Sequence, residues 1–341
     1  MVGQRLRGVT RAGLGLLALN ILVLAGCWLV QALASAQEAQ EFPPYGVLVD
    51  VGGYRLHIYC SGPQISGQAS VILESGLGAP GLVWTLVQSE VAKHHRVCSY
   101  DRAGYGWSDP GPSPRTAKQF ATELHVLLQN MGEKPPYLLA SHSFGSLIAR
   151  VYTSTYPHEV VGLLFIDPRN EDFFSRMPPE SLAIDERNFR AAQWLKILTP
   201  LGYTRLFGSL GLLPDFKVYL APLPDEVEAA AWAKMIYSPG HWETSVAERE
   251  NSVISYAQAG ATTLPAELPL IVHTTENGWK AWSTGNETMD EAGRATWFAL
   301  QEEQSHLTSR GKWQVISNSG HYLYFEQPSI ISKAIDRLLA P

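Results

Sequence analysis

The sequence predicts an α/β fold, in which a mostly parallel sheet is flanked by helices and a helical segment is inserted between the sixth and seventh strands. After an opening pair of short strands, segments typical of strands and helices alternate between residues 70 and 166. This alternation stops at about 169–265, and strand character returns after residue 268. Because 45% of the 341 residues are hydrophobic and only 17% are charged, the chain has ample material for a core.

The predicted elements follow one another in a regular order along the chain. Eight short, largely apolar segments are expected as strands: 45–51, 54–60, 70–74, 96–100, 137–140, 161–166, 268–272 and 313–316. Helices are expected where apolar residues recur at helical spacing: 83–91, 116–131, 147–156, about 290–305 and 330–339. Gly52-Gly53 favours a hairpin between the first two strands, and Gly132 suits the C-terminal cap of the helix that Thr116 begins.

Residues 169–265 are interpreted as a helical cap inserted into the main fold, although a continuation of that fold without a separate lid is the alternative. The segment is rich in aromatic residues, among them Phe173, Phe174, Trp194, Phe207, Trp232 and Trp242. An apolar, aromatic cap indicates a substrate with a lipophilic acyl or alcohol group, unless these side chains only pack the cap onto the core.

The first 40 residues are expected to lie outside the domain, which covers residues 41–341. Three arginines within the first eleven residues precede an uncharged run at 12–37, of which 14–30 is strongly apolar. A positive flank followed by an apolar core is typical of export, with the arginines kept on the cytoplasmic side. The rest of the chain is therefore expected outside the cytoplasm.

Three fates of this apolar segment remain open. It is long enough to span a bilayer and to stay as a single-pass anchor, which is our first interpretation. Cleavage near Ala36 is the second, because Ala34-Ser35-Ala36 fits a signal-peptidase site. The third is a lipoprotein lipidated at Cys27, although the apolar run continues past this cysteine. Residues 37–44 are expected as a linker to the domain.

The net charge argues against one class of partner, and the cysteine content is compatible with an oxidising compartment outside the cytoplasm. The net charge is −6 and no basic block follows the N-terminus, so nucleic acid is not an expected partner. Only Cys60 and Cys98 lie outside the apolar segment. An even pair of cysteines in an exported protein is compatible with a disulfide.

The segment Ser141-His142-Ser143-Phe144-Gly145 lies between a predicted strand and a predicted helix. A serine with small residues two positions before and after it fits a nucleophile elbow, a sharp turn that exposes the serine hydroxyl above the sheet. Gly145 fits the usual G-x-S-x-G pattern, whereas Ser141 replaces its first glycine with another small residue. The sequence therefore predicts Ser143 as a nucleophile, the alternative being a serine-rich turn without chemistry.

His321 follows the last predicted strand in a Ser/Gly/Asn-rich loop. Such a loop can reach back over the sheet, where the imidazole would serve as general base to Ser143. The order along the chain, nucleophile first and histidine last, agrees with this role.

An attack by Ser143 on a carbonyl would create an oxyanion, which needs two backbone N–H donors. The elbow offers the N–H of Phe144, and the turn Ser75-Gly76-Leu77-Gly78 after a buried strand offers that of Leu77. Glycines in this turn would let the backbone approach the substrate, although they also serve simply to turn the chain.

From Tyr45 onward the chain resembles the serine-dependent α/β-hydrolase-fold superfamily. The segments that carry the resemblance are VILESGLGAP, RVCSYDRAGYGWSDPGPSPRTA, LLASHSFGS, GLLFIDP and SNSGHYLYFEQP. More narrowly, it is similar to bacterial, N-terminally anchored hydrolases whose activities are mostly unassigned. The resemblance implies an eight-stranded, mostly parallel sheet and a Ser-His-acid triad, with no metal or organic cofactor.

The resemblance also requires an acid that orients His321, and two positions compete for this role. The commoner location in the superfamily is the loop after strand 268–272, where only Glu276 is available. The other is directly after the strand that follows the elbow helix, where Asp167 stands. We prefer Asp167, with Glu276 as the alternative acid, and Glu171 and Asp172 in the same loop as Asp167 are further possibilities.

The implied architecture places the second strand antiparallel to strand 96–100. Cys60 is the last residue of the second strand, and Cys98 lies within strand 96–100. A disulfide between them is therefore expected, with two buried free thiols as the alternative.

The sequence therefore predicts a membrane-anchored or exported serine hydrolase, most simply one that cleaves a lipophilic carboxylic ester. The serine argues against the dehalogenase and epoxide hydrolase branches, which use a carboxylate as the nucleophile. An amidase or aminopeptidase, an acyltransferase and a carbon–carbon hydrolase share the triad and remain open. So does a non-catalytic binding module that kept the fold.

Overall fold

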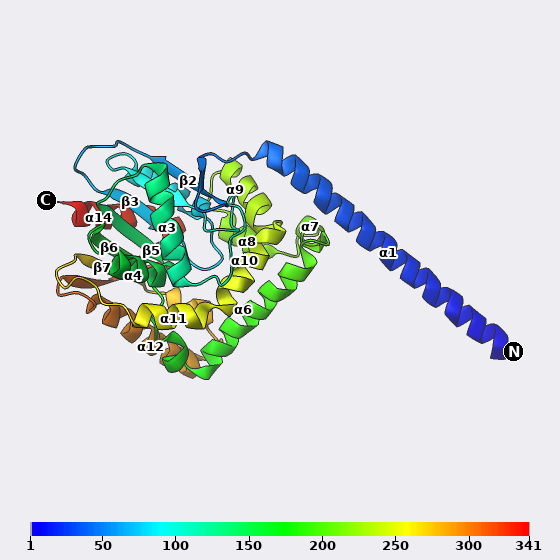
Figure 1. Cartoon of the computed structure of the whole chain (residues 1–341). Coiled ribbons are helices and arrows are strands. Elements are labelled where there is room, and N and C mark those ends of the chain that lie inside the picture. Colours follow the sequence, from blue (N-terminus) through cyan, green and yellow to red (C-terminus); the bar gives the residue numbers. More distant parts are fainter. Residues whose placement is uncertain (1, 341) are drawn as a thin grey trace.

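The computed structural model describes residues 2–340 and contains an eight-stranded sheet with the order β1-β2-β4-β3-β5-β6-β7-β8 (Figure 1). The strands are β1 (Val47–Asp50), β2 (Arg55–Ser61), β3 (Ser70–Glu74), β4 (Val97–Tyr100), β5 (Tyr137–His142), β6 (Val160–Ile166), β7 (Leu270–Thr275) and β8 (Gly311–Ile316). β2 runs antiparallel to both β1 and β4, and all the other neighbouring strands are parallel. The predicted mostly parallel sheet is confirmed.

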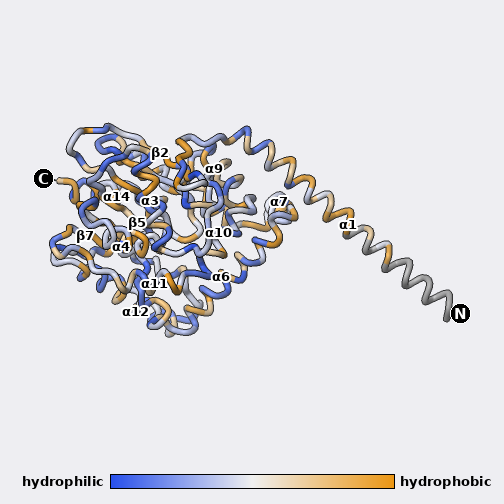
Figure 2. Tube along the Cα trace, in the orientation of Figure 1, coloured by the Kyte–Doolittle hydropathy of each residue, from blue (hydrophilic) through white to orange (hydrophobic). Residues whose placement is uncertain are grey.

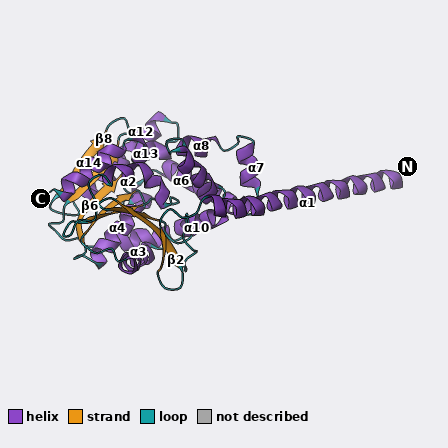
Figure 3. Cartoon of the chain, turned by 90° about the horizontal axis from the view of Figure 1, so that it is seen from above, coloured by secondary structure: helices purple, strands orange, loops and turns teal. Residues whose placement is uncertain are grey.

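Alternating side chains on the central strands supply two hydrophobic cores, one on each face of the sheet. On β5, Leu139 packs into one core, whereas Leu138 and Ala140 pack into the other. The first core is covered by α3 (Ala117–Met131), α4 (Gly145–Thr155), α11 (Ser252–Gly260) and α12 (Glu287–Ser305). The second is covered by η1 (Gly81–Trp84), α2 (Thr85–Val91), α13 (Leu323–Glu326) and α14 (Pro328–Leu339) (Figure 3).

The caps of α3 are those that the sequence predicts. The side chain of Thr116 accepts a hydrogen bond from the Gln119 N–H, and Gly132 adopts a left-handed conformation with φ of 81°.

β7 lies further along the chain than the predicted strand 268–272, because it begins at Leu270 and continues to Thr275. Thr274 and Thr275 pair with Val315 and Ile316 of β8, and threonine is a favourable strand residue. Glu276 consequently comes directly after the strand.

The segment between β6 and β7 is helical. Its elements are α5 (Phe173–Arg176), α6 (Pro179–Leu198), α7 (Tyr203–Ser209), α8 (Pro214–Leu220), α9 (Asp225–Ala231), η2 (Trp232–Ile236), α10 (Pro239–Glu250) and α11. α11 packs on α3 and α4, since Ser255 accepts the Ala117 N–H at 3.0 Å and the Ala259 carbonyl accepts from Arg150 at 2.9 Å. We therefore reserve the name cap helices for α6 to α10, residues 179–250.

α1 (Val2–Glu41) is one long helix that extends away from the domain (Figure 1). Figure 2 shows hydrophobic residues along it, and its part Ile21–Glu41 is long and apolar enough to cross a membrane, with 6% of its apolar window buried. The linker expected at 37–44 is helical up to Glu41, because alanine, glutamine and glutamate at 36–41 favour a helix.

Candidate active site

Ser143 lies at the junction of β5 and α4, with a backbone φ of 51°. A positive φ is rare for a residue with a side chain and indicates a strained turn. Gly145 permits the turn, because a Cβ at that position would lie 2.6 Å from the carbonyl oxygen of Ser75. Ser141 is fully buried beside β6, which explains why only a small residue fits there. The predicted strand-turn-helix context of Ser143 is therefore present.

Asp167 follows β6, also with a positive φ of 45°, and its side chain is fully buried. One carboxylate oxygen, Oδ2, lies 2.6 Å from Nδ1 of His321. The other, Oδ1, accepts the backbone N–H of Thr275 at 3.1 Å. The structure thus brings Asp167 and His321 together and fixes the carboxylate from both sides.

Glu276, the alternative acid, is exposed, and its carboxylate contacts Asn318 instead of His321. Its carboxylate accepts the backbone N–H of Asn318 at 2.8 Å, and so it stabilises the turn that precedes His321. Because β7 continues to Thr275, it is the N–H of this strand residue that reaches Asp167, while Glu276 points to the neighbouring loop.

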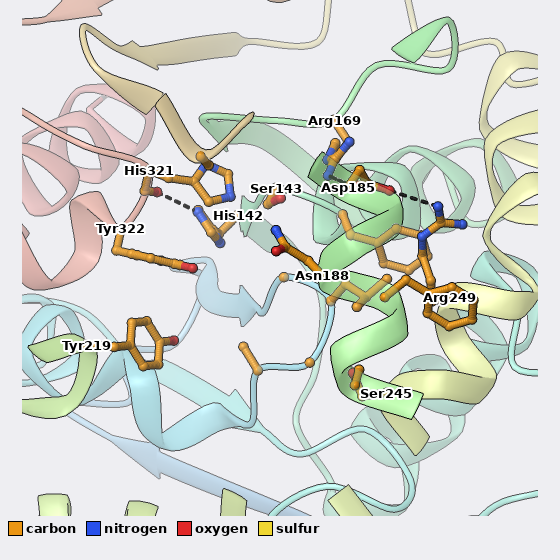
Figure 4. A pocket seen from close by; sticks show the side chains of 18 of the residues that line it. His142, Ser143, Arg169, Asp185, Asn188, Tyr219, Ser245, Arg249, His321 and Tyr322 are labelled. Carbon is orange, nitrogen blue, oxygen red and sulfur yellow. Dashed lines mark hydrogen bonds and ion pairs between the residues drawn. The ribbon is translucent and has the colours of Figure 1, made fainter. Parts of the chain in front are cut away.

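Ser143 and His321 line one cavity of about 550 Å³ (Figure 4). Leu77 and Phe144 belong to the same lining. The parallel strands end at this edge of the sheet, so residues that follow β3, β5, β6 and β8 meet there. No hydrogen bond joins the side chains of Ser143 and His321 in the described chain. Catalytic hydrogen bonds commonly tighten only when a substrate binds.

His142, the residue before Ser143, is a site residue that the sequence analysis did not single out. Its Nε2–H donates to the backbone carbonyl of His321 at 2.8 Å, and this contact holds the loop that carries His321 (Figure 4). Burial, together with the nearby His321, keeps the pKa of His142 well below its ordinary value. In the sequence, only the position of His142 inside the predicted elbow indicated that it could belong to the site.

The glycine-rich turn after β3 is held by the buried guanidinium of Arg102. This side chain donates to the carbonyl oxygens of Ser75 and Gly76, at 2.7 and 2.8 Å. It also pairs with Glu74 and with Glu248 of α10. Burial outweighs the attraction of Arg102 and raises the pKa of Glu74 to about 7.

The turn approaches Ser143 closely. A Cβ on Gly76 would lie 2.9 Å from His142 Nδ1 and 3.3 Å from Ser143 Cβ. A side chain at position 76 would therefore crowd His142 and Ser143, which favours glycine there.

Aromatic side chains of the cap reach the cavity only in part. Of the six that the sequence analysis named, only Phe174 and Trp242 line it. Phe173 is buried in the core and Trp194 is 63% exposed. Other aromatic residues of the lining were not anticipated: Phe189, Phe216, Tyr219, Tyr256, Trp282, Tyr322 and Tyr324.

Cys60 and Cys98 are partners in the β2–β4 register and are joined as a disulfide. With Glu133 they form a group whose potential ligand atoms lie within 4.8 Å of one another. Bonded sulfurs offer no thiolate, so this group does not fit a metal ion.

Residues 69–328 match the family described as alpha/beta hydrolase fold. The chain is 24% identical over 270 residues to the uncharacterized protein YqjL of Bacillus subtilis, covering 79% of this chain and 83% of YqjL. It is 21% identical over 301 residues to the (Lyso)-N-acylphosphatidylethanolamine lipase of Bos taurus, covering 81% and 80% of the two chains. A 136-residue match to the probable transporter efuK of Hormonema carpetanum is 34% identical but covers 38% of this chain and only 20% of efuK.

Among solved structures, a thermophilic esterase from Thermogutta terrifontis superposes with a TM-score of 0.55 at 20% identity. The match covers 86% of this chain and 97% of the esterase. These likenesses confirm the resemblance drawn from the sequence motifs. Because the family match spans most of the chain and the sheet has the expected form, the protein belongs to the alpha/beta hydrolase fold family.

Proposed function

We propose that the protein is a serine hydrolase that cleaves a carboxylic ester with a lipophilic acyl or alcohol group. The observation that carries the proposal is the hydrogen bond between the buried Asp167 and His321, which lines the same cavity as Ser143. The esterase and lipase among its relatives support a hydrolase.

In the proposed mechanism, Ser143 Oγ attacks the ester carbonyl carbon while His321 Nε2 takes the hydroxyl proton. Asp167 accepts the Nδ1–H of His321, which leaves Nε2 as the ring nitrogen for proton transfer. The tetrahedral intermediate then expels the alcohol, which takes the proton from His321. Water repeats the sequence on the acyl-enzyme, and the acid and free Ser143 are released.

We propose the backbone N–H groups of Leu77 and Phe144 as the donors to the oxyanion. In a trans peptide the C=O and the following N–H point in opposite directions. Since Arg102 binds the Gly76 carbonyl, the N–H of Leu77 is directed away from Arg102. Phe144 precedes the first turn of α4, where backbone N–H groups and the helix dipole favour a negative charge.

The lining of the cavity supports a substrate with an apolar part. Phe174, Phe216, Trp242 and Met235 lie along it, and an ester chain placed there would leave water for an apolar surface. We propose that the cap helices help to form this apolar pocket, since α6, α8 and α10 each contribute side chains to it.

We further propose that α1 stays on the mature protein as a membrane anchor, with the domain outside the cytoplasm. Gln31 is buried against the domain and donates to the carbonyl of Tyr237 at 2.9 Å. Arg205 of α7 donates to Gln31 at 2.8 Å and to Glu38 at 2.7 Å. Cleavage near Ala36 would remove the contacts of Gln31, so these contacts favour retention.

The experiment that tests the activity is labelling with a fluorophosphonate, which reacts with activated serines. The full chain in detergent micelles is compared with Ser143→Ala and His321→Ala, and Ser245→Ala serves as a cavity-lining control. Labelling is expected in the wild type and the control and is lost in the other two. A folded wild-type protein that resists both a large and a small phosphonate would contradict an activated Ser143.

A further inference from the structure

Two arginines and one aspartate meet in the wall of the cavity that Ser143 lines. Asp185 of α6 accepts from Arg169, which follows β6, at 3.0 Å and from Arg249 of α10 at 2.8 Å. Figure 4 shows this group on the opposite side of Ser143 from His321. All three residues line the cavity.

The group carries one positive charge in excess. Burial by itself raises the pKa of Asp185, but the two guanidinium charges outweigh it and lower the pKa below its ordinary value. Asp185 is therefore a full negative charge that balances only one arginine. The remaining acidic residue of the lining, Asp215 on α8, is exposed.

This excess charge lies where water has limited access. The side chains of Arg169 and Arg249 are only 12% and 20% exposed. Nη1 of Arg169 is buried and has no hydrogen-bond partner within residues 2–340. A buried donor without a partner is costly, so a bound acceptor would be stabilised there.

The position of the group relative to the nucleophile is fixed. The backbone N–H of Arg169 donates to the carbonyl of Ser143 at 3.0 Å. The aromatic rings of Phe173 and Trp282 lie 3.7 and 4.4 Å from the Arg169 guanidinium carbon and hold that side chain in place. Asn188 of α6 adds an amide to the same wall.

We propose that Arg169 and Arg249 form an anion-binding subsite that holds a carboxylate of the substrate while Ser143 attacks an ester elsewhere in the same molecule. This inference rests on the proposed function and specifies its substrate class as half esters of dicarboxylic acids. A single carboxylate matches the single excess charge, and guanidinium groups bind carboxylates through paired hydrogen bonds.

The same ion group also joins α6 and α10 to the loop after β6, and a purely structural role would affect every substrate alike. The test must therefore compare charged with neutral ligands. Binding to the Ser143→Ala variant of the full chain, measured by calorimetry in detergent, requires no turnover. The ligands are monoethyl esters of dicarboxylic acids of four to ten carbons and neutral ethyl esters of equal length.

At the optimal length, the half ester is expected to bind about tenfold or more tightly than its neutral match. Adding Arg249→Met should abolish this preference, whereas adding Arg249→Lys should retain part of it. Adding Arg187→Met, at an exposed arginine of α6 outside the cavity lining, should leave the preference unchanged. Melting temperatures establish that each variant is folded. Equal binding of charged and neutral esters, or binding of neither, would overturn the subsite.

Two further results separate this inference from the proposed function. If the half ester binds to Ser143→Ala but the wild type does not cleave it, the subsite stands and ester hydrolysis fails. If a phosphate-bearing ester of equal length binds more tightly than the carboxylate, the assigned ligand class is wrong.

Discussion

His321 Nδ1 lies 2.6 Å from Oδ2 of Asp167, although 154 residues separate the two along the chain. The carboxylate is fully buried and is also held by the N–H of Thr275, so its orientation is set by the sheet. The imidazole is consequently fixed by a rigid element, even though it lies in a loop.

The choice of acid gives the first prediction. Asp167→Asn should lower kcat by about 10³–10⁴-fold, because an amide cannot stabilise the imidazolium and its NH₂ favours the wrong tautomer of His321. Glu276→Gln should keep kcat within about twofold of the wild type, since within the described residues the Glu276 carboxylate accepts the Asn318 N–H and does not contact His321. Steady-state hydrolysis of an activated ester measures both. The opposite ranking would reassign the acid to Glu276.

The close approach of the glycine-rich turn gives the second prediction. Gly76→Ala should lower kcat about tenfold or more, because the added methyl would displace the turn or Ser143 and so disturb the proposed oxyanion donor Leu77. Gly162→Ala is the matched control, since its Cβ would meet other atoms only at 3.6 Å or beyond. Equal activity of the two variants would mean that the turn does not take part in the reaction.

Local sequence patterns predicted the parts of the site that depend on a single turn. Ser143 and Gly145 lie within one five-residue pattern, and the small residues of this pattern follow directly from the steric demands of the turn. The acid could not be chosen in this way, because both Asp167 and Glu276 follow strands. The choice depends on how far β7 extends beside β8, which is a matter of pairing between distant segments.

The charged wall of the cavity could not be predicted for a similar reason. Asp185 and Arg249 are 64 residues apart on different cap helices, and only the packing of these helices brings them together. Trp194 illustrates the same limit, since an aromatic residue in a helical segment can face either the cavity or the solvent.

The pH dependence of stability gives the third prediction. His241 is fully buried, and burial lowers its pKa from 6.5 to about 3. A histidine with a lowered pKa contributes stability that is complete above the unfolded value and is lost as the pH falls below it. From pH 7 to pH 5, this residue alone should reduce the free energy of unfolding by about 2 kcal/mol.

Urea unfolding of the wild type and His241→Phe at both pH values measures this contribution. Phenylalanine cannot titrate and removes an Nδ1 that has no hydrogen-bond partner within the described residues. The variant should therefore lose less stability on acidification than the wild type. If His241→Phe loses as much stability between pH 7 and pH 5 as the wild type does, the pKa of His241 is not lowered in the folded protein.

Glu74 affects the pH dependence of stability in the opposite sense. Its raised pKa of about 7 adds stability at low pH that is lost as the pH rises.

The disulfide gives the fourth prediction. Cys60→Ser with Cys98→Ser should lower the free energy of unfolding by about 2–4 kcal/mol, because the bond restricts the unfolded chain over 38 residues. The pair lies at the β2–β4 contact, away from the cavity, so fluorophosphonate labelling of Ser143 should persist. Denaturant unfolding under non-reducing conditions checks the first effect. Alkylation of two thiols in the unreduced wild type would show that the bond does not form.

The N-terminal helix gives the last prediction. A C-terminally tagged full chain should sediment with membranes and resist extraction by carbonate, and its intact mass should still include residues 27–36. Gln31 and Arg205 form their contacts only if this part of α1 is retained. Cys27→Ser is the control for lipidation and should leave the membrane fraction unchanged. A mature N-terminus at Gln37 would establish a cleaved signal, and loss of membrane attachment in Cys27→Ser would establish a lipoprotein.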